Sequence, residues 1–260
     1  MNLRLTHIGT ATVLLEIGAL RLLTDPALDA SGGKYSFGFG TGSQKLEDPA
    51  LPPEGLGRID AVLLSHDHHA DNLDTLGRAL LPSVGKVLTT ASGAKRLGGN
   101  AIGLNPWATH ELTGADGLRV KITATPARHG PPLSGPLVGD VIGFILEWSG
   151  QAYGPIYISG DTVWFEGVAE VGQRFKLGTA LLHVGGVKFG LTGPIRYTMD
   201  GPEAARAATA LGAKTVIPIH YEGWSHFRES RVATEKAFTA AGISERVKWL
   251  ERGLPTLLEV

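Results

Sequence analysis

Residues 65–74 read SHDHHADNLD and directly follow a short apolar run. They place three histidines and three aspartates within nine residues. In an extended segment, side chains two residues apart project to the same side, so we expect His66 and His68 to converge on one cation. A polar loop that caps a helix through Asp71 or Asn72 is the simpler alternative, but a cap requires one such residue rather than six.

Three further apolar segments each end in a single residue that could bind a metal ion. They are residues 120–124, followed by His129 in PARHG, residues 156–158, followed by Asp161 in SGDT, and residues 216–219, followed by His220 in HYEG. Taken singly, each residue also suits a helix cap or a hydrogen-bonded loop. Because ligands of α/β proteins bind outside the carboxyl ends of strands, four such ends can meet in one crevice. Together they match what a pair of metal ions demands.

The wider pattern predicts two layers of strands. Three apolar, β-branched runs open the chain without intervening helices, and these are residues 3–8, 11–17 and 20–24. After about residue 57, short buried-type strands alternate with segments of helical character. Pro202 and Gly212 mark the start and the end of one such helix. We therefore expect two similar halves packed sheet against sheet, with helices outside, in a single domain over residues 1–260.

The connection between these two parts is long and rich in Gly, Pro and Ser, from residue 25 to about residue 57. A loop of that length is more often a functional lid than a plain link. Its aromatic residues Tyr35, Phe37 and Phe39 are placed to cover a pocket.

Composition limits the partners and the ligand chemistry. Lys and Arg total 24 against 25 Asp and Glu, so a net charge of -1 provides no global attraction to nucleic acid. The chain has no Cys, so any metal must be held by nitrogen and oxygen. The N-terminus lacks the pattern of a secretory signal, and no apolar run is long enough to insert into a membrane. We expect a cytoplasmic protein with a small-molecule substrate, while its oligomeric state stays open.

The motifs resemble those of the metallo-β-lactamase superfamily. SHDHHADNLD is similar to its HxHxDH motif, and PARHG, YISGDT and IPIHYEG are similar to its later His, Asp and His motifs. The opening THIGTATVLLE and the following LTDPAL resemble the lactonase-like and phospholipase-D-like branch. The resemblance implies an α/β fold, a four-layer αβ/βα sandwich of two mixed sheets packed face to face, with the metal site in the cleft between the sheets.

The same resemblance implies one or two divalent metal ions. The implied ligands are His66, His68 and His129 for the first ion, Asp161 as the bridge, and Asp71 and His220 for the second ion. A set made only of nitrogen and oxygen suits zinc, manganese or iron.

The spacing departs from the family motif in one respect. The motif places Asp four residues and His five residues after its first His, and here those positions hold Ala and Asp. Either one residue is inserted after His68, or the register starts at Asp67, and both readings put Asn72 where a second-site His is expected. Asn binds a cation more weakly than imidazole does, so the second ion is expected to be loose, replaced or absent. His69 is the residue placed to compensate.

The function implied by the resemblance is metal-dependent hydrolysis. A metal-bound hydroxide would cleave a small ester, lactone or phosphoester, with Asp71 orienting the water or accepting its proton. His183 and His226 are candidates for protonating the leaving group, although a structural role is favoured for each. A nuclease or phosphodiesterase of the same superfamily is an alternative, and so is a catalytically degenerate protein that binds a metal or a ligand.

Three basic residues could receive an anionic part of the substrate, and these are Arg128, Lys188 and Arg196. Solvated surface charge is the alternative role for each of them.

Overall fold

The computed structural model describes residues 2–38 and 40–260, and it contains two large sheets. The first sheet has seven strands, which in spatial order are β15 (Thr256–Glu259), β1 (Asn2–Gly9), β2 (Thr12–Ile17), β3 (Leu20–Thr24), β6 (Ala61–Leu63), β7 (Lys86–Thr90) and β8 (Ala101–Leu104). Strands β15 to β3 pair antiparallel, whereas β3, β6, β7 and β8 pair parallel. The sheet is therefore mixed.

The second sheet has six strands and is also mixed. In spatial order they are β14 (Thr215–Ile219), β13 (Thr179–His183), β12 (Ile156–Ile158), β11 (Ile142–Trp148), β10 (Arg119–Pro126) and β9 (Thr109–Thr113). Strands β9 to β12 pair antiparallel, and β12, β13 and β14 pair parallel. Because β11 is antiparallel to both of its neighbours, β10 runs in the same direction as β12. The carboxyl ends of β10, β12, β13 and β14 therefore lie at one edge of this sheet.

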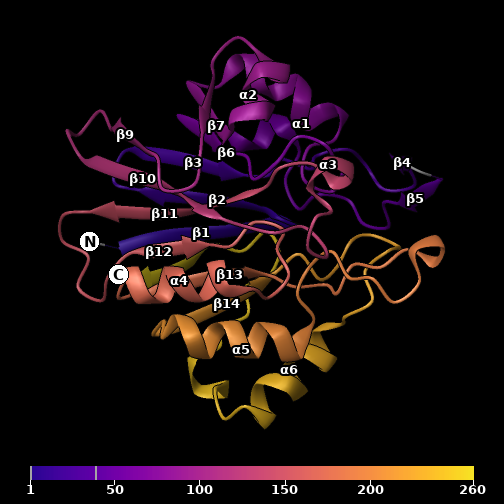
Figure 1. Cartoon of the computed structure of the whole chain (residues 1–260). Helices are drawn as coiled ribbons and strands as arrows, with labels where there is room; N and C mark the ends of the chain where they lie inside the picture. The colour runs from indigo at the N-terminus through magenta and orange to yellow at the C-terminus, as the bar shows by residue number, and fades with distance from the viewer. Residues whose placement is uncertain (1, 39) are drawn as a thin grey trace.

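Helices cover the outer faces of the two sheets. Figure 1 shows α1 (Thr75–Leu80) and α2 (Ala91–Leu97) on one side of the molecule, and α4 (Glu166–Arg174), α5 (Gly201–Leu211) and α6 (Arg231–Ala240) on the other. One buried cluster joins the inner faces of the sheets, with Leu5 and Leu22 from the first sheet and Phe144 and Ile217 from the second. A second cluster lies between the second sheet and its helices, and a third lies between the first sheet and its helices. This arrangement confirms the four-layer αβ/βα sandwich.

Helix α5 illustrates how local sequence sets the boundaries. The Asp200 side chain accepts a hydrogen bond from the Glu203 backbone N–H at 3.0 Å, which caps the first turn. Pro202 lies in that turn, and Gly212 follows the last residue with a positive φ of 62°. These positions confirm the expectation for Pro202 and Gly212, since Pro is favoured at a helix start and Gly just after a helix end.

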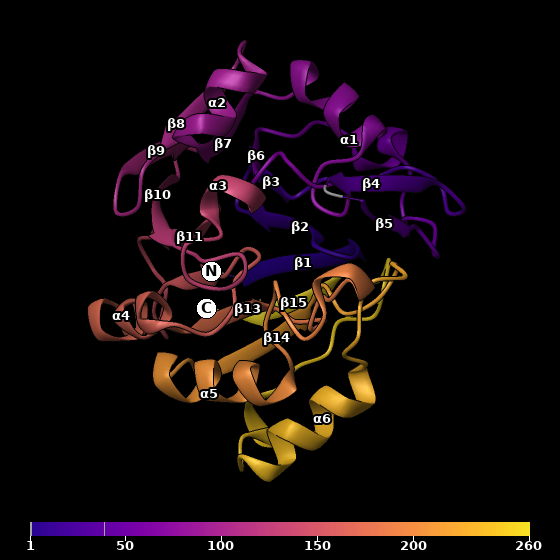
Figure 2. The ribbon, with the colours of Figure 1, turned by 45° about the vertical axis from the view of Figure 1, so that its right-hand side comes forward.

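The long connection contains structure that its composition does not predict. Strands β4 (Lys34–Gly38) and β5 (Thr41–Gln44) form a separate hairpin, which Figure 2 shows at the edge of the packed layers. The short 3-10 helix η1 (Pro53–Leu56) follows. Phe39, one of the three expected lid aromatics, lies outside the described residues.

The short edge strands were also not anticipated. They are β8, β9 and β15, of 4, 5 and 4 residues, and each exposes a part of its side chains. Segments of four or five residues are too short for an alternation to be read, and neighbouring strands stabilise them. Between residues 131 and 139 the chain forms α3 (Gly135–Val138). Three further 3-10 turns are η2 (Leu81–Ser83), η3 (Gly190–Thr192) and η4 (Ser244–Arg246). Among the described residues, every helix is too short or too polar to cross a bilayer.

Candidate metal centre

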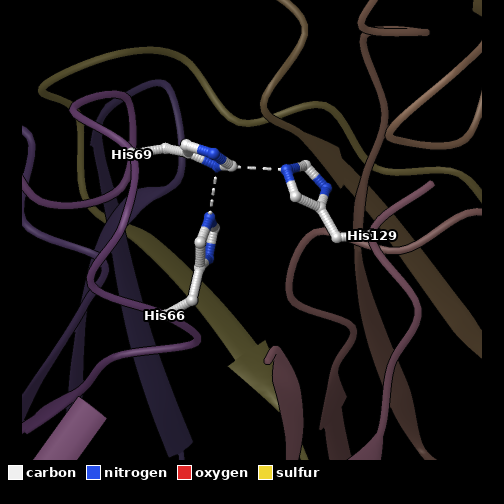
Figure 3. A group of neighbouring side chains, drawn as sticks. All are labelled: His66, His69 and His129. Atoms are coloured by element: carbon white, nitrogen blue, oxygen red, sulfur yellow. Dashed lines mark hydrogen bonds between the residues drawn. The ribbon is translucent and has the colours of Figure 1, made fainter. Parts of the chain in front are cut away.

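Three histidine rings converge where the first sheet meets the second. His66 Nε2 lies 3.0 Å from His69 Nδ1, and His129 Nε2 lies 3.1 Å from the same atom. Figure 3 shows the three rings turned toward a common point, with His66 and His69 on one loop and His129 on another. The loops follow β6 and β10, so two strand ends that are distant in sequence supply one cluster.

Hydrogen bonds on the far side of the rings fix which nitrogens face the cluster. His129 Nδ1 donates to the Tyr197 carbonyl at 2.8 Å, because a carbonyl can only accept. The Nε2 atom of His129 therefore presents a lone pair. Burial lowers the pKa of all three rings, and it lowers that of His69 to about 3, with the neighbouring His129 adding to the effect. Neutral imidazoles with converging lone pairs are the ligand set that zinc and similar divalent ions require.

A second cluster of two carboxylates and one imidazole adjoins the first. His220 Nε2 lies 3.3 Å from Asp71 Oδ2 and 3.5 Å from Asp161 Oδ2. His220 Nδ1 donates to the Val184 carbonyl at 3.1 Å, which turns Nε2 toward the carboxylates. Asp161 and His220 follow β12 and β14, as the expectation of converging strand ends requires. His220 holds a positive φ of 62°, an unusual backbone conformation for a non-Gly residue and one that is often found at functional sites.

The charges of this second cluster support each other. Burial by itself favours the neutral forms, but the hydrogen bonds from His220 and His226 hold the pKa of Asp71 well below its usual value. Burial likewise opposes the charge on His220, yet Asp161 and then Asp71 raise its pKa to about 9. Asp161 has a pKa below its normal range, owing first to His220 and then to the hydrogen bond from His183, both of which outweigh burial.

Two histidines orient these carboxylates from behind. His183, at the end of β13, has Nδ1 2.9 Å from Asp161 Oδ1. His226 has Nε2 3.1 Å from Asp71 Oδ2, and its Nδ1 contacts the Ser43 hydroxyl on the β4–β5 hairpin. Both side chains are buried. Their positions are those of residues that align ligands, and Ser43 is a contributor that the sequence motifs did not reveal.

The geometry corrects the expectation for His68 and Asp67. The His66 and His68 ring centroids are 6.4 Å apart, and His68 belongs to neither cluster. It packs instead beside Gly139, where an added Cβ would lie 2.3 Å from the ring. Asp67 is held by Arg96 through two hydrogen bonds of 2.9 and 2.6 Å.

The reason for this correction is local backbone geometry. Residues 65–74 are not extended, since the backbone N–H groups of Asn72 and Leu73 both donate to the His69 carbonyl. The chain also bends at Asp67 and His68, and this bend, rather than the turn after His69, places His69 next to His66. If His69 is the second histidine of the family motif, the extra residue lies between His66 and His69. Neither alignment in the sequence analysis has an insertion at that point.

Alanine variants of the neighbouring histidines test this register. After loading with Zn²⁺, we expect His69→Ala to retain little of the metal, because the variant lacks one of three converging nitrogens. His68→Ala should retain the zinc content of the unmodified chain, since its ring lies outside both clusters. Elemental analysis after gel filtration in metal-free buffer measures both. Retention of zinc by His69→Ala together with loss from His68→Ala would restore the spacing first expected.

A mainly apolar cavity of about 270 Å³ opens onto the two clusters. His69, Asp71, His129 and His226 line it, together with the hydroxyl residues Thr41, Ser134 and Thr192. Its walls are mainly apolar and come from three separate segments, and they include Phe37, Val138, Val187, Phe189, Ile195 and Tyr197. None of the described residues that line it is lysine or arginine. Small-molecule sites commonly combine such walls with a few polar groups.

The expected lid aromatics divide between two roles. Phe37 lines the cavity and stacks on His69, with ring centroids 5.3 Å apart. Tyr35 instead donates to Asp29 at 2.7 Å and packs against Trp224. Phe189 was missed from the sequence, although its ring lies parallel to that of His226 at 5.1 Å. A single apolar residue in a Gly-rich loop carries no periodic signal that could have marked it.

The basic residues proposed for anion recognition are used elsewhere. Arg196 forms ion pairs with Asp200 and Glu203. Arg128 donates to the Trp164 carbonyl and lies over the Phe165 ring, 4.9 Å from its centre. Lys188 is not among the cavity residues. Arg128 lines an adjoining cavity that shares His129, but neither it nor the other two lines the cavity that opens onto the clusters.

Comparison with known proteins identifies relatives along most of the chain. The model of the β-lactamase superfamily domain matches residues 20–221. A protein of Methanoregula boonei, named UPF0173 metal-dependent hydrolase, is 34% identical over 194 residues, which cover 71% of this chain and 78% of that protein. A protein of Methanosphaerula palustris with the same name is 30% identical over 243 residues, covering 90% of this chain and 91% of that protein.

Solved structures share the fold. The isothiocyanate hydrolase from Delia radicum gut bacteria superposes with a TM-score of 0.81 at 24% identity, covering 99% of this chain and 100% of that one. A possible metal-dependent hydrolase from Veillonella parvula gives a TM-score of 0.82 at 23% identity, covering 98% and 99%. At these identities the likeness supports the sandwich architecture.

Proposed function

The chain belongs to the β-lactamase superfamily, and on that premise we propose that it is a metal-dependent hydrolase of small, uncharged, apolar esters or lactones. The observation that carries the proposal is the cavity. It has mainly apolar walls and no lining lysine or arginine among the described residues, and His69, Asp71 and His129 of the two clusters line it.

The cluster residues that line the cavity suit hydrolysis. A divalent ion bound there would polarise a substrate carbonyl and lower the pKa of water from about 15.7 to about 7. His66, His69 and His129 would hold it, since their nitrogens already face one another at 3.0 and 3.1 Å. Asp71 lines the cavity and would accept a hydrogen bond from the attacking water. His226 fixes the orientation of Asp71.

The walls of the cavity account for the choice of substrate. Phe37, Phe189 and Tyr197 keep bulk water from the reacting carbonyl and bind apolar groups through buried area. A phosphodiester carries a negative charge that would lose its hydration there without gaining a cationic partner from the walls. The net charge of -1 and the ion pairs of Arg196 favour the same choice.

A substrate panel tests this proposal. We expect the zinc- or manganese-loaded protein to hydrolyse p-nitrophenyl butyrate or a simple γ-lactone with a kcat/KM at least about 100-fold above that for bis(p-nitrophenyl) phosphate, which corresponds to about 2.7 kcal/mol. Phe189→Ala should lower kcat/KM for the apolar ester about 10-fold or more, through lost apolar contact. Tyr153→Ala, which truncates an exposed ring away from the cavity, serves as the control. Faster cleavage of the phosphodiester would contradict the proposed substrate class.

A further inference from the structure

Asn72 occupies the place where the family motif carries a metal-binding histidine, and its side chain is fully buried. It lies between the two carboxylates of the second cluster. In the orientation that satisfies both, its amide nitrogen is 3.3 Å from Asp71 Oδ1 and 3.3 Å from Asp161 Oδ2. An amide nitrogen carries two protons, so one Asn side chain can donate to both carboxylates at once.

Each of the four carboxylate oxygens of Asp71 and Asp161 faces a nitrogen of the protein. Asn72 donates to one oxygen of Asp71 and to one oxygen of Asp161. The other oxygen of Asp71 faces His226 Nε2 at 3.1 Å, and the other oxygen of Asp161 faces His183 Nδ1 at 2.9 Å. Side chains therefore already donate to all four oxygens, and a second cation would have to share these oxygens with the donors.

The three-histidine cluster is different in kind. His69 Nδ1 faces two imidazole nitrogens and can donate a proton to only one of them. At least one of the two close nitrogen–nitrogen contacts therefore lacks a well-formed hydrogen bond, an arrangement that a cation between the rings relieves. The chain thus contains one group of ligands that needs an ion and a second group whose charge its own side chains offset.

Distance alone does not exclude a second ion, because the ligand atoms of Asp71, Asp161 and His220 lie within 4.8 Å of one another. To help bind it, Asn72 would have to rotate and present its oxygen, and both carboxylates would then lose their shared donor. A neutral amide oxygen is also a weaker ligand than imidazole. From this geometry we infer that the chain binds one metal ion tightly, at His66, His69 and His129, and that the Asn72 amide takes the place of the second ion.

Metal counting tests this inference without any substrate. The purified chain is stripped, loaded with excess Zn²⁺ or Mn²⁺, and passed through gel filtration in metal-free buffer before elemental analysis. We expect one ion per chain in the unmodified protein and two in Asn72→His, which restores a second-site imidazole. Titration with Co²⁺, followed by its visible absorption, should reach its end point at one and at two equivalents respectively. Gln173→His adds a histidine on the exposed face of α4 and should leave the count at one.

The location of the single ion is tested with variants that keep Asn72. His129→Ala should lose the ion, whereas His220→Ala should retain it. If Asn72→His does not fold, the near-isosteric Asn72→Asp, which replaces the donor with a third carboxylate, should also bind a second ion. Two tightly held ions in the unmodified chain, or loss of the only ion from His220→Ala, would overturn the inference. Neither result would contradict the proposed hydrolase activity, which the substrate panel tests separately.

Discussion

Replacement of His129 by alanine is expected to empty the three-histidine site and to reduce hydrolysis at least about 1,000-fold, or about 4 kcal/mol of transition-state stabilisation. The ring contributes Nε2 to the cluster, and the Tyr197 carbonyl fixes its tautomer. Removing it leaves two nitrogens from a single loop, which cannot surround an ion from both sheets. The fold should persist, because His129 lies in a loop after β10 rather than in the apolar cluster between the sheets.

All three consequences can be measured on one preparation. Elemental analysis gives the zinc content, ester hydrolysis gives the activity, and circular dichroism shows whether the fold persists. His110→Ala is the matched control, since that histidine lies on β9 and belongs to neither cluster. It should keep both metal and activity. Undiminished zinc and turnover in His129→Ala would remove the basis for assigning this centre as the active site.

The second large effect concerns stability rather than chemistry. Lys45→Met is expected to lower the free energy of unfolding by about 3–5 kcal/mol, because it leaves the Asp74 carboxylate buried without its partner. Lys45 Nζ lies 3.0 Å from Asp74 Oδ2, and the two side chains are 2% and 0% exposed. Lys45 also donates to the Ala27 carbonyl at 2.8 Å. The pair ties the β4–β5 hairpin to Asp74, whose other oxygen caps α1 through the Gly77 N–H.

Thermal and urea unfolding measure this change. The melting temperature should fall by roughly 10 °C for a chain of this size. Arg58→Met is the control, because Arg58 pairs with Asp60 while 85% exposed and should cost less than about 1 kcal/mol. Equal stability losses in the two variants would show that the buried pair has no special weight.

Features that depend on a local run of residues were predicted from the sequence, and features that depend on the folded backbone were not. The strand ends at His129, Asp161 and His220 were placed correctly, because an apolar run followed by a polar residue is a local pattern. The sandwich was confirmed because the order of strands and helices leaves few ways to bury both sheets. The sequence left both His68 and His69 as ligands, and the structure brings only His69 to His66 and His129. An extended backbone would favour His68, but the bend at Asp67 and His68 is not visible in residue types.

The sequence by itself determined the chemistry that the chain has available, since the absence of Cys and the histidine- and aspartate-rich strand ends restrict any ion to nitrogen and oxygen ligands. Tertiary structure alone decided how those groups are distributed. It assigned Asp67 to Arg96, placed Asn72 between two carboxylates, and brought Phe37 and Phe189 together as walls of one cavity. These outcomes depend on contacts between segments far apart in the chain, whose geometry is set by packing and hydrogen bonding in the folded state rather than by any local pattern of residues.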